Sequence, residues 1–278
     1  MNTIEFTLAL GTGSVLAGFL GALTGLGGGV VIVPLLVLAF SVDIHYAIGA
    51  SLVSVIATSS GSAAAYVREG YSNIRVGMLL EIATTLGALS GAMLATRVPA
   101  NGLAIVFGLV LMYSANLTRH QPASPPHDAG QDRWAAALRL DSTYPTPAGL
   151  RAYRVQRVPL GFGLMYAAGI LSGLLGIGSG AVKVLAMDRA MRLPFKVSTT
   201  TSNFMIGVTA AASAGIYLHR GYIAPGLAMP VVLGVLPGSM LGARFLSTAK
   251  TPWLRIVFTW VIAALAVEML FNGMTGRL

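Results

Sequence analysis

The chain of 278 residues contains no cysteine and few charged side chains. Without cysteine, disulfides, thiolate metal ligands and thiol nucleophiles are excluded. Charged residues make up 10% of the sequence, whereas a typical soluble domain has about 25%. Hydrophobic residues make up 55%. This composition indicates an integral membrane protein.

Signals for catalysis and for nucleotide binding are also missing. The four histidines (His45, His120, His127 and His219) are scattered over predicted loops and do not form a metal-ligand set. We find no Ser/His/Asp set or paired carboxylates in the apolar runs, and the glycine-rich segments match no complete phosphate-binding motif. The sequence therefore indicates neither an enzyme nor a cofactor. The net charge of +9 fits basic loops on the cytoplasmic side better than nucleic-acid binding.

Apolar runs of membrane-spanning length recur along the chain. Five of them have about the 20 residues that a helix needs to cross a bilayer: 47–67, 76–96, 197–218, 223–243 and 253–272. The run at 102–117 is shorter, and those at 3–40 and 159–187 are longer than one crossing. Frequent Gly, Ser and Thr in these runs favour closely packed helices.

Three pairs of segments indicate that the chain is duplicated. GLGGGVV at 25–31 pairs with GIGSGAV at 176–182, and YVREGY at 66–71 pairs with YLHRGY at 217–222, both 151 residues apart. We call this distance along the chain the repeat spacing. GALSGAMLATR at 87–97 pairs with GVLPGSMLGAR at 234–244, 147 residues apart. We therefore expect a first membrane repeat at 1–117, a hydrophilic linker at 118–158 and a second repeat at 159–278. The Pro-Thr-Pro-Ala-Gly segment at 145–149 predicts a small hairpin in the linker.

The distribution of basic residues predicts the orientation. If the linker is cytoplasmic and each long first run is a hairpin that enters and leaves on one side, only Arg97, Arg220 and Arg277 lie outside. If each first run crosses once, basic residues are split nearly evenly. Because Lys and Arg favour cytoplasmic loops, we expect hairpins and a cytoplasmic linker. The two repeats would then have opposite topologies.

Glycines interrupt both predicted hairpins. Gly27, Gly28 and Gly29 precede a short apolar segment at 30–40, about 17 Å long if helical, and Gly178, Ser179 and Gly180 occupy the matching position. Entering from opposite faces, the two short helices would meet near mid-membrane with their N–H groups facing one cavity, which is a suitable anion site. The alternative is that these glycines only allow close helix packing.

Polar residues in the following runs fit the same cavity. Ser51, Ser54 and Thr58 share one helical face, and the second half offers Thr199, Thr200, Ser202 and Asn203. Such groups can bind an oxyanion without adding charge. Hydrogen bonding between helices explains them equally well.

Two ionisable residues inside the apolar runs are candidates for function. Lys183 follows Gly180 by three residues and would lie in the first turn of a short helix that begins near Ala181, where it can pair with a bound anion. Its counterpart in the first repeat is Ile32. Glu81 is a candidate carrier of a coupled proton, although an interfacial carboxylate that pairs with Arg75 is the interpretation that its position favours.

The segments GLGGGVVIVPLL, GIGSG, YLHRGY and GSMLGAR resemble those of the TauE/SafE family of sulfite exporters and toluenesulfonate uptake permeases. The resemblance covers both repeats and implies transport of sulfite, sulfonates or related anions across the bacterial inner membrane. The chain departs from the pattern at Ser179, where the family often has glycine, and at Leu185, where the first repeat has Pro34.

The sequence thus predicts an all-α integral membrane protein, a polytopic helical bundle of two inverted repeats, each with a glycine-broken first hairpin. We expect a secondary transporter of small anions, with sulfite or an organosulfonate favoured, that works by alternating access. The expected partners are the small anion and the lipid bilayer. The alternatives are an uncoupled anion channel or facilitator and a membrane scaffold subunit that does not transport.

Overall fold

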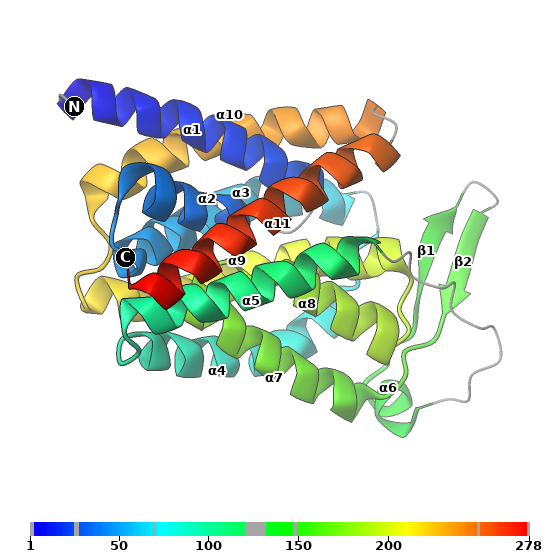
Figure 1. Ribbon diagram of the computed structural model, residues 1–278. Coiled ribbons are helices and arrows are strands. Elements are labelled where there is room, and N and C mark those ends of the chain that lie inside the picture. Colours follow the sequence, from blue (N-terminus) through cyan, green and yellow to red (C-terminus); the bar gives the residue numbers. More distant parts are fainter. Residues whose placement is uncertain are drawn as a thin grey trace.

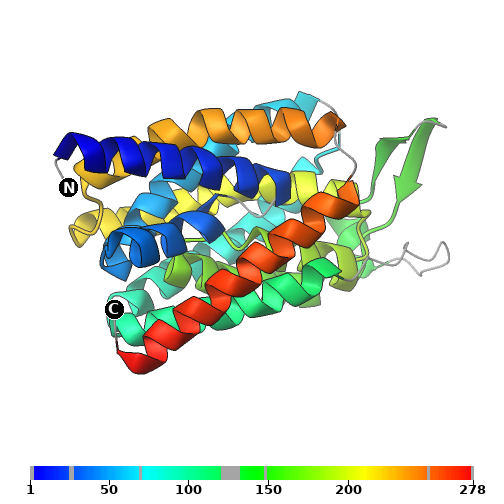
Figure 2. The same cartoon turned by 45° about the horizontal axis from the view of Figure 1, so that its top comes forward.

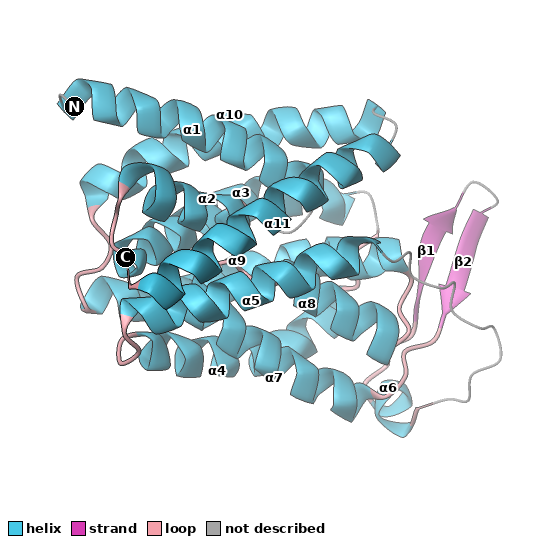
Figure 3. Ribbon diagram, in the orientation of Figure 1, coloured by secondary structure: helices cyan, strands magenta, loops and turns pink. Residues whose placement is uncertain are grey.

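The computed structural model describes residues 3–24, 28–68, 71–119, 132–146, 149–248 and 251–276. These residues form a bundle of long helices with one small β-hairpin at an end (Figures 1 and 3). The first part of the chain contains α1 (Thr3–Thr24), α2 (Gly29–Pro34), the π-helix η1 (Leu35–Ala39), α3 (Ile44–Arg68), α4 (Ile74–Ala95) and α5 (Ala100–Arg119). The last part contains α7 (Val158–Leu175), α8 (Gly180–Leu185), the π-helix η2 (Ala186–Ala190), α9 (Phe195–His219), α10 (Pro225–Thr248) and α11 (Thr251–Thr275).

The element boundaries recur along the chain. Helices α2, η1 and α3 begin one repeat spacing before α8, η2 and α9, and the same distance separates the starts of α4 and α5 from those of α10 and α11. Helices α1 and α7 also end one repeat spacing apart. The element order of the first part is therefore repeated in the last part.

Helices from the two parts interlock. Helix α1 packs most extensively against α10, and α4 packs most extensively against α7. At these crossings glycines allow backbone contact: a Cβ on Gly18 of α1 would meet the Val235 carbonyl. At the equivalent position of α7, a Cβ on Gly169 would meet the Thr84 carbonyl. Figure 2, turned from the view of Figure 1, also places α1 beside α10.

The same contacts correct one alignment made from the sequence. The third pair of segments aligns Gly87 with Gly234, but Gly87 lies against the Tyr166 carbonyl and Gly238 lies against the Val15 carbonyl. Gly87 therefore corresponds to Gly238, at the repeat spacing that the other two pairs share. Glycines four residues apart lie on one face of a helix, so a shift of one turn gives a similar sequence match.

The central crossing joins α3 and α9. A Cβ on Gly207 would meet the Ser59 hydroxyl oxygen, and one on Gly178 would lie 2.8 Å from Ile206 Cγ2 and 3.3 Å from Val55 Cγ1. Helices α5 and α11 also pack together and run in opposite directions. In Figure 1, α5 ends on the side of the hairpin and α11 ends at the C-terminus, on the opposite side.

The short segment after the first break differs from the single helix expected at 30–40. It is one α-helical stretch, α2, followed by the π-helix η1. Pro34 cannot explain the change by itself, because η2 follows α8 in the same way and the equivalent residue there is Leu185.

The described part of the linker is ordered against the helices. It contains α6 (Arg133–Ala137) and the strands β1 (Ser142–Thr146) and β2 (Gly149–Tyr153), which pair antiparallel and confirm the predicted hairpin. Asp132 accepts hydrogen bonds from the Trp134 N–H, at the start of α6, and from the Val158 N–H, at the start of α7. Asn73, which caps α4, donates to the Leu140 carbonyl and the Tyr153 hydroxyl.

Three described helices are long and apolar enough to cross a membrane: Ile74–Ala95, Val158–Leu175 and Pro225–Gly242. Shorter apolar helices cover 5–21, 29–39, 44–60, 100–113 and 263–275. Helix α9, at the position of the predicted run 197–218, belongs to neither group. Its buried face carries several hydroxyl side chains, including those of Ser198, Thr201 and Ser213, which lower its hydropathy while α3 and α4 cover it.

The contact between α4 and α7 generates a prediction about Gly173. A Cβ at this position would meet the Ala88 carbonyl and lie 2.8 Å from the Ala92 nitrogen, whereas a Cβ on Gly163 of the same helix would meet nothing within 4 Å. We expect Gly173→Ala to lower the unfolding free energy by about 1–3 kcal/mol through overpacking. Thermal unfolding of the purified protein in detergent measures this difference.

Gly163→Ala is the matched control. Because alanine has the higher helix propensity, this change should leave the unfolding temperature unaltered or raise it slightly. Equal unfolding temperatures for the two variants would contradict close backbone packing of α4 on α7.

Candidate functional site

The break between α7 and α8 is a sharp turn with three residues at positive φ. Gly176, which caps the end of α7, has φ +67°; Gly178 has φ +69° and Ser179 has φ 45°. Glycine adopts this left-handed region without the steric cost that a Cβ brings. The turn reverses the chain so that α8 begins at Gly180, one residue before the predicted Ala181.

The break between α1 and α2 lies against the second break. Gly27 lies outside the described residues, and Gly28 caps the start of α2. A Cβ on Gly29 would lie 2.6 Å from the Ser51 hydroxyl oxygen and 2.8 Å from the Gly176 carbonyl oxygen. The two glycine breaks therefore meet in the structure, and only a hydrogen atom fits between Gly29 and Gly176.

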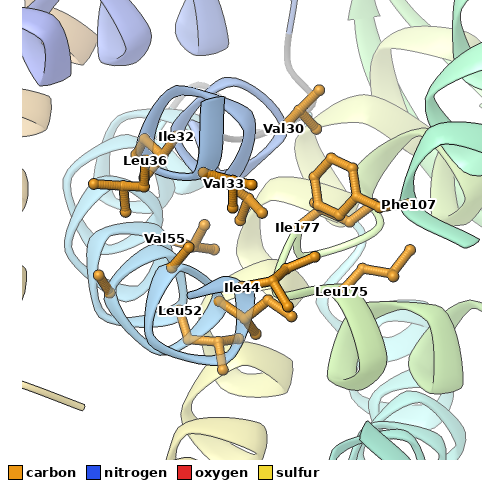
Figure 4. Close-up of a cluster of buried hydrophobic side chains, with 14 of the residues drawn as sticks. Val30, Ile32, Val33, Leu36, Ile44, Leu52, Val55, Phe107, Leu175 and Ile177 are labelled. Carbon is orange, nitrogen blue, oxygen red and sulfur yellow. The ribbon is translucent and has the colours of Figure 1, made fainter. Parts of the chain in front are cut away.

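Apolar side chains seal one side of this meeting point. In Figure 4, Ile177 of the second break lies near Phe107 of α5, with Val30 of α2 on the same side. All three side chains are almost completely buried. Residues 176–180 of the second break are buried as well.

The predicted hydroxyl groups of Ser51 and Ser54 in α3 and of Ser179 in the second break all satisfy backbone carbonyls. Ser51 Oγ donates to the Gly176 carbonyl at 2.8 Å, and Ser54 Oγ donates to the Ser51 carbonyl at 2.7 Å. Ser179 Oγ donates to the Ala168 carbonyl at 2.6 Å. Each hydroxyl has one proton, so in this arrangement these groups cannot donate to an anion without rotating.

Two further predicted polar residues of the second half, Thr200 and Asn203, are less central. Thr200 Oγ1 donates to carbonyls of its own helix, those of Lys196 and Val197. Asn203 is half-buried, and its amide has no polar partner among the described residues. Neither side chain contacts the glycine breaks through a hydrogen bond.

Lys183 of α8 is fully buried, and its charge is balanced across α9. Its Nζ donates to Thr209 Oγ1 at 2.6 Å, and Thr209 Oγ1 donates to Glu81 Oε1 of α4 at 2.7 Å. Thr85 Oγ1 donates to the same carboxylate oxygen at 3.3 Å. Glu81, Thr209 and Lys183, the buried charge cluster, thus link three helices.

This geometry corrects the interpretation of Glu81 as an interfacial partner of Arg75. The Glu81 side chain is 9% exposed and faces Lys183, whereas Arg75 Nη1 donates to the Arg139 carbonyl in the linker. The two side chains therefore leave α4 toward different surroundings, which the position of Glu81 in the sequence did not reveal.

Thr209 is the member of the cluster that was missed in the sequence. Its counterpart at the repeat spacing is Thr58, which had been placed on the polar face of the first repeat. Applying that spacing to Thr58 would have found Thr209, shortly after the STTTSN segment.

The fold is that of a polytopic helical membrane protein with two broken helices that meet inside it. The family model for the sulfite exporter TauE/SafE matches residues 10–269. The chain therefore belongs to the TauE/SafE family, a family of membrane transporters.

Curated relatives cover nearly the whole chain. It is similar to the probable membrane transporter protein YunE of Bacillus subtilis, with 27% identity over 93% of this chain and 95% of the relative. A probable membrane transporter protein of Xylella fastidiosa is 26% identical over 98% of both chains. The probable membrane transporter protein MJ0441 of Methanocaldococcus jannaschii is 24% identical over 92% of both. No solved structure matches the chain.

The second break generates a prediction about Gly178. Gly178→Ala puts a side chain at positive φ and 2.8 Å from Ile206 Cγ2. We expect it to lower the unfolding free energy by about 1–3 kcal/mol for the backbone conformation, with a further loss from the contact with α9. Thermal unfolding in detergent measures the total.

Gly221→Ala separates the two causes. Gly221 has φ +77° and a Cβ there would meet nothing within 4 Å. The stability lost by Gly221→Ala therefore reports the backbone cost alone. If both variants lose the same stability, the break does not pack against Ile206 as described.

Proposed function

We propose that this protein is a secondary transporter of small anions, with sulfite or an organosulfonate as substrate. The observation that carries this proposal is the contact of Gly29 with the Gly176 carbonyl and the Ser51 hydroxyl, which brings the two helix breaks together inside the bundle. Broken helices that meet at the centre of a bundle are typical of substrate sites in secondary transporters. Membership of the TauE/SafE family supports the same class of substrate.

The starts of α2 and α8 supply donors for an anion. The first hydrogen bonds at these starts run from Val31 N and Ile32 N to the Gly28 carbonyl, and from Lys183 N to the Ser179 carbonyl. The N–H groups before them, at Gly29, Val30, Gly180 and Val182, precede the intrahelical bonds, as at any helix start. We place the substrate at these N–H groups, with Ser51 and Ser54 near the first break and Lys183 near the second.

Alternating access would move two groups of helices against each other, and each group contains helices from both parts of the chain. Helices α1, α2, α3 and α10 pack with one another, as do α4, α7, α8 and α9. The backbone contacts between α1 and α10 and between α4 and α7 oppose a motion in which one repeat moves as a unit against the other, because such a motion would break both contacts. The interface between the groups is the crossing of α3 and α9.

Inverted repeats are part of this proposal. They are supported by the recurrence of element boundaries at the repeat spacing and by the opposite directions of α5 and α11 (Figure 1). In an inverted pair, exchanging the conformations of the two groups converts an outward-open state into an inward-open state.

Anion binding tests the proposal directly. We expect sulfite or methanesulfonate to raise the unfolding temperature of the purified protein, with about 2.7 kcal/mol of stabilisation at 100 times Kd. Acetate should stabilise less. Lys183→Met should abolish the shift, whereas Lys196→Met, which changes a lysine at the exposed start of α9, should leave it unchanged.

Loss of the anion shift in both lysine variants, or in neither, would argue against a role of Lys183 in binding. A protein that no anion stabilises would instead favour a scaffold in which the glycines only pack helices. Sulfite flux into proteoliposomes that follows the sulfite gradient and ignores an imposed pH gradient would favour an uncoupled facilitator.

The proposed cytoplasmic position of the linker has its own test, since the chain is free of cysteine. Leu150→Cys, at an exposed position of β2, should react with a membrane-impermeant maleimide only after cells are permeabilised. Arg220→Cys, at the exposed opposite end of the bundle between α9 and α10, should react in intact cells. The reverse pattern would invert the proposed orientation.

A further inference from the structure

The buried charge cluster of Glu81, Thr209 and Lys183 is incompletely paired. Glu81 Oε2 is buried and has no hydrogen-bond partner among the described residues. Lysine has three N–H donors, and Thr209 Oγ1 is the acceptor that the described residues provide for Nζ. A carboxylate oxygen and ammonium protons thus remain unpaired in one buried place, where leaving them so is unfavourable.

Thr209 holds the two charges apart while linking them. Its hydroxyl accepts from Lys183 and donates to Glu81. It can donate only one proton, and the Met205 carbonyl at 3.0 Å is a second acceptor within reach. Rotation of this hydroxyl toward Met205 would free the carboxylate while leaving the Thr209 lone pair available to Lys183.

We propose that this cluster is a proton-switched anion site, in which a protonated Glu81 frees the Lys183 charge for a small oxyanion and a deprotonated Glu81 excludes that anion. The inference rests on the proposed anion transport and names its coupling step. The transported anion would move together with one proton.

Charge balance is the physical reason. With Glu81 ionised, the buried cluster is neutral without a substrate, and a monovalent anion beside Lys183 would leave one net negative charge in a site with little water. With Glu81 protonated, the same anion restores neutrality. Because an unbalanced buried charge is strongly unfavourable, binding of the anion and binding of the proton to Glu81 favour each other.

No other charged group among the described residues competes for this role. Lys183 is the charged group that acts electrostatically on Glu81, and Glu81 is the one that acts on Lys183. The described elements packed against α4 are α7 and α9. Their other titratable side chains make no hydrogen bond or resolved electrostatic contact with Glu81; these are Tyr166, Lys196, Tyr217 and His219.

The cluster also occurs only once in the repeated fold. The residues one repeat spacing from Lys183, Glu81 and Thr209 are Ile32, Val232 and Thr58. The threonine is present in both places, but the two charged residues are present only beside α8. One site of this kind gives one proton for each anion.

The test compares sulfite binding by the wild-type protein and by Glu81→Gln between pH 5.5 and pH 8.5. Glutamine cannot take up a proton, so the sulfite affinity of this variant carries no contribution from the protonation of residue 81. The ratio of wild-type Kd to variant Kd cancels the titration of sulfite itself, which both proteins share. Above the pH at which Glu81 loses its proton, we expect this ratio to rise about tenfold for each pH unit.

Proteoliposome transport provides the second readout. An imposed pH gradient should drive sulfite accumulation by the wild-type protein and have no effect on Glu81→Gln, which should still exchange sulfite for sulfite. Glu268→Gln, at an exposed position of α11, is the matched carboxylate control and should behave like the wild type. Thr209→Ser should retain the coupling, whereas Thr209→Val should weaken it.

The outcomes separate this inference from the proposed function. Wild-type protein that transports sulfite while Glu81→Gln retains the full response to the pH gradient overturns the switch and leaves anion transport standing. A constant ratio of the two Kd values across the pH range also overturns it. If neither protein binds sulfite, that result contradicts the proposed function itself. Size-exclusion chromatography establishes that each variant is folded before it is compared.

Discussion

Carbonyl groups at the break between α7 and α8 have to find hydrogen-bond donors inside the protein. Within a membrane, non-helical backbone is tolerated only where protein or an aqueous cavity satisfies it. Ser51 of α3 donates to the Gly176 carbonyl, and Ser202 of α9 donates to the Gly180 carbonyl at 3.3 Å. These bonds require α3 and α9 to pass close to the break. The two helices cross with Gly207 against Ser59, and α10 and α4 pack against this crossing pair.

The glycines of the outer helices follow from this central arrangement. If α3 and α9 fill the middle, the broken helices α1 and α7 must be held from the outside, and each is held by a helix of the other part of the chain. Contact between backbones compensates for the weak hydrophobic driving force between helices in lipid. The interlocked packing also means that neither part of the chain can form its own closed bundle.

Much of this fold can be predicted from the sequence, because local constraints on the backbone leave recognisable patterns in it. The repeat spacing, the positions of both breaks and the hairpin at 145–149 all reflect local constraints on glycine, proline and helix length. The one-turn error in pairing Gly87 arose because a helix presents similar faces every four residues. Sequence similarity alone does not distinguish these faces, whereas a contact with the Tyr166 carbonyl does.

Side-chain partners were harder to predict, since they depend on which helices cross. The burial of Lys183 follows from its place just after a glycine break, but its partner Glu81 comes far earlier in the sequence and lies on a helix that meets α9 only in the folded bundle. Near the linker, the basic side chain of Arg75 offered a simpler match for Glu81. Arg75 instead donates to the Arg139 carbonyl in the linker, and the Glu81 carboxylate faces the interior.

The charges of Lys183 and Glu81 are not repeated although the backbone is, and this difference bears on the proposed coupled transport. The backbone repeats itself closely: α2 and α8 have six residues each and are followed by π-helices of equal length. In the proposed alternating-access mechanism, equivalent halves would give two conformations of similar energy. The pair of Lys183 and Glu81 occurs at one break only, so under the proposed switch a change in its charge would stabilise one conformation over the other. The repeat would then provide the two states, and the single charged cluster would determine which ligand can shift the balance between them.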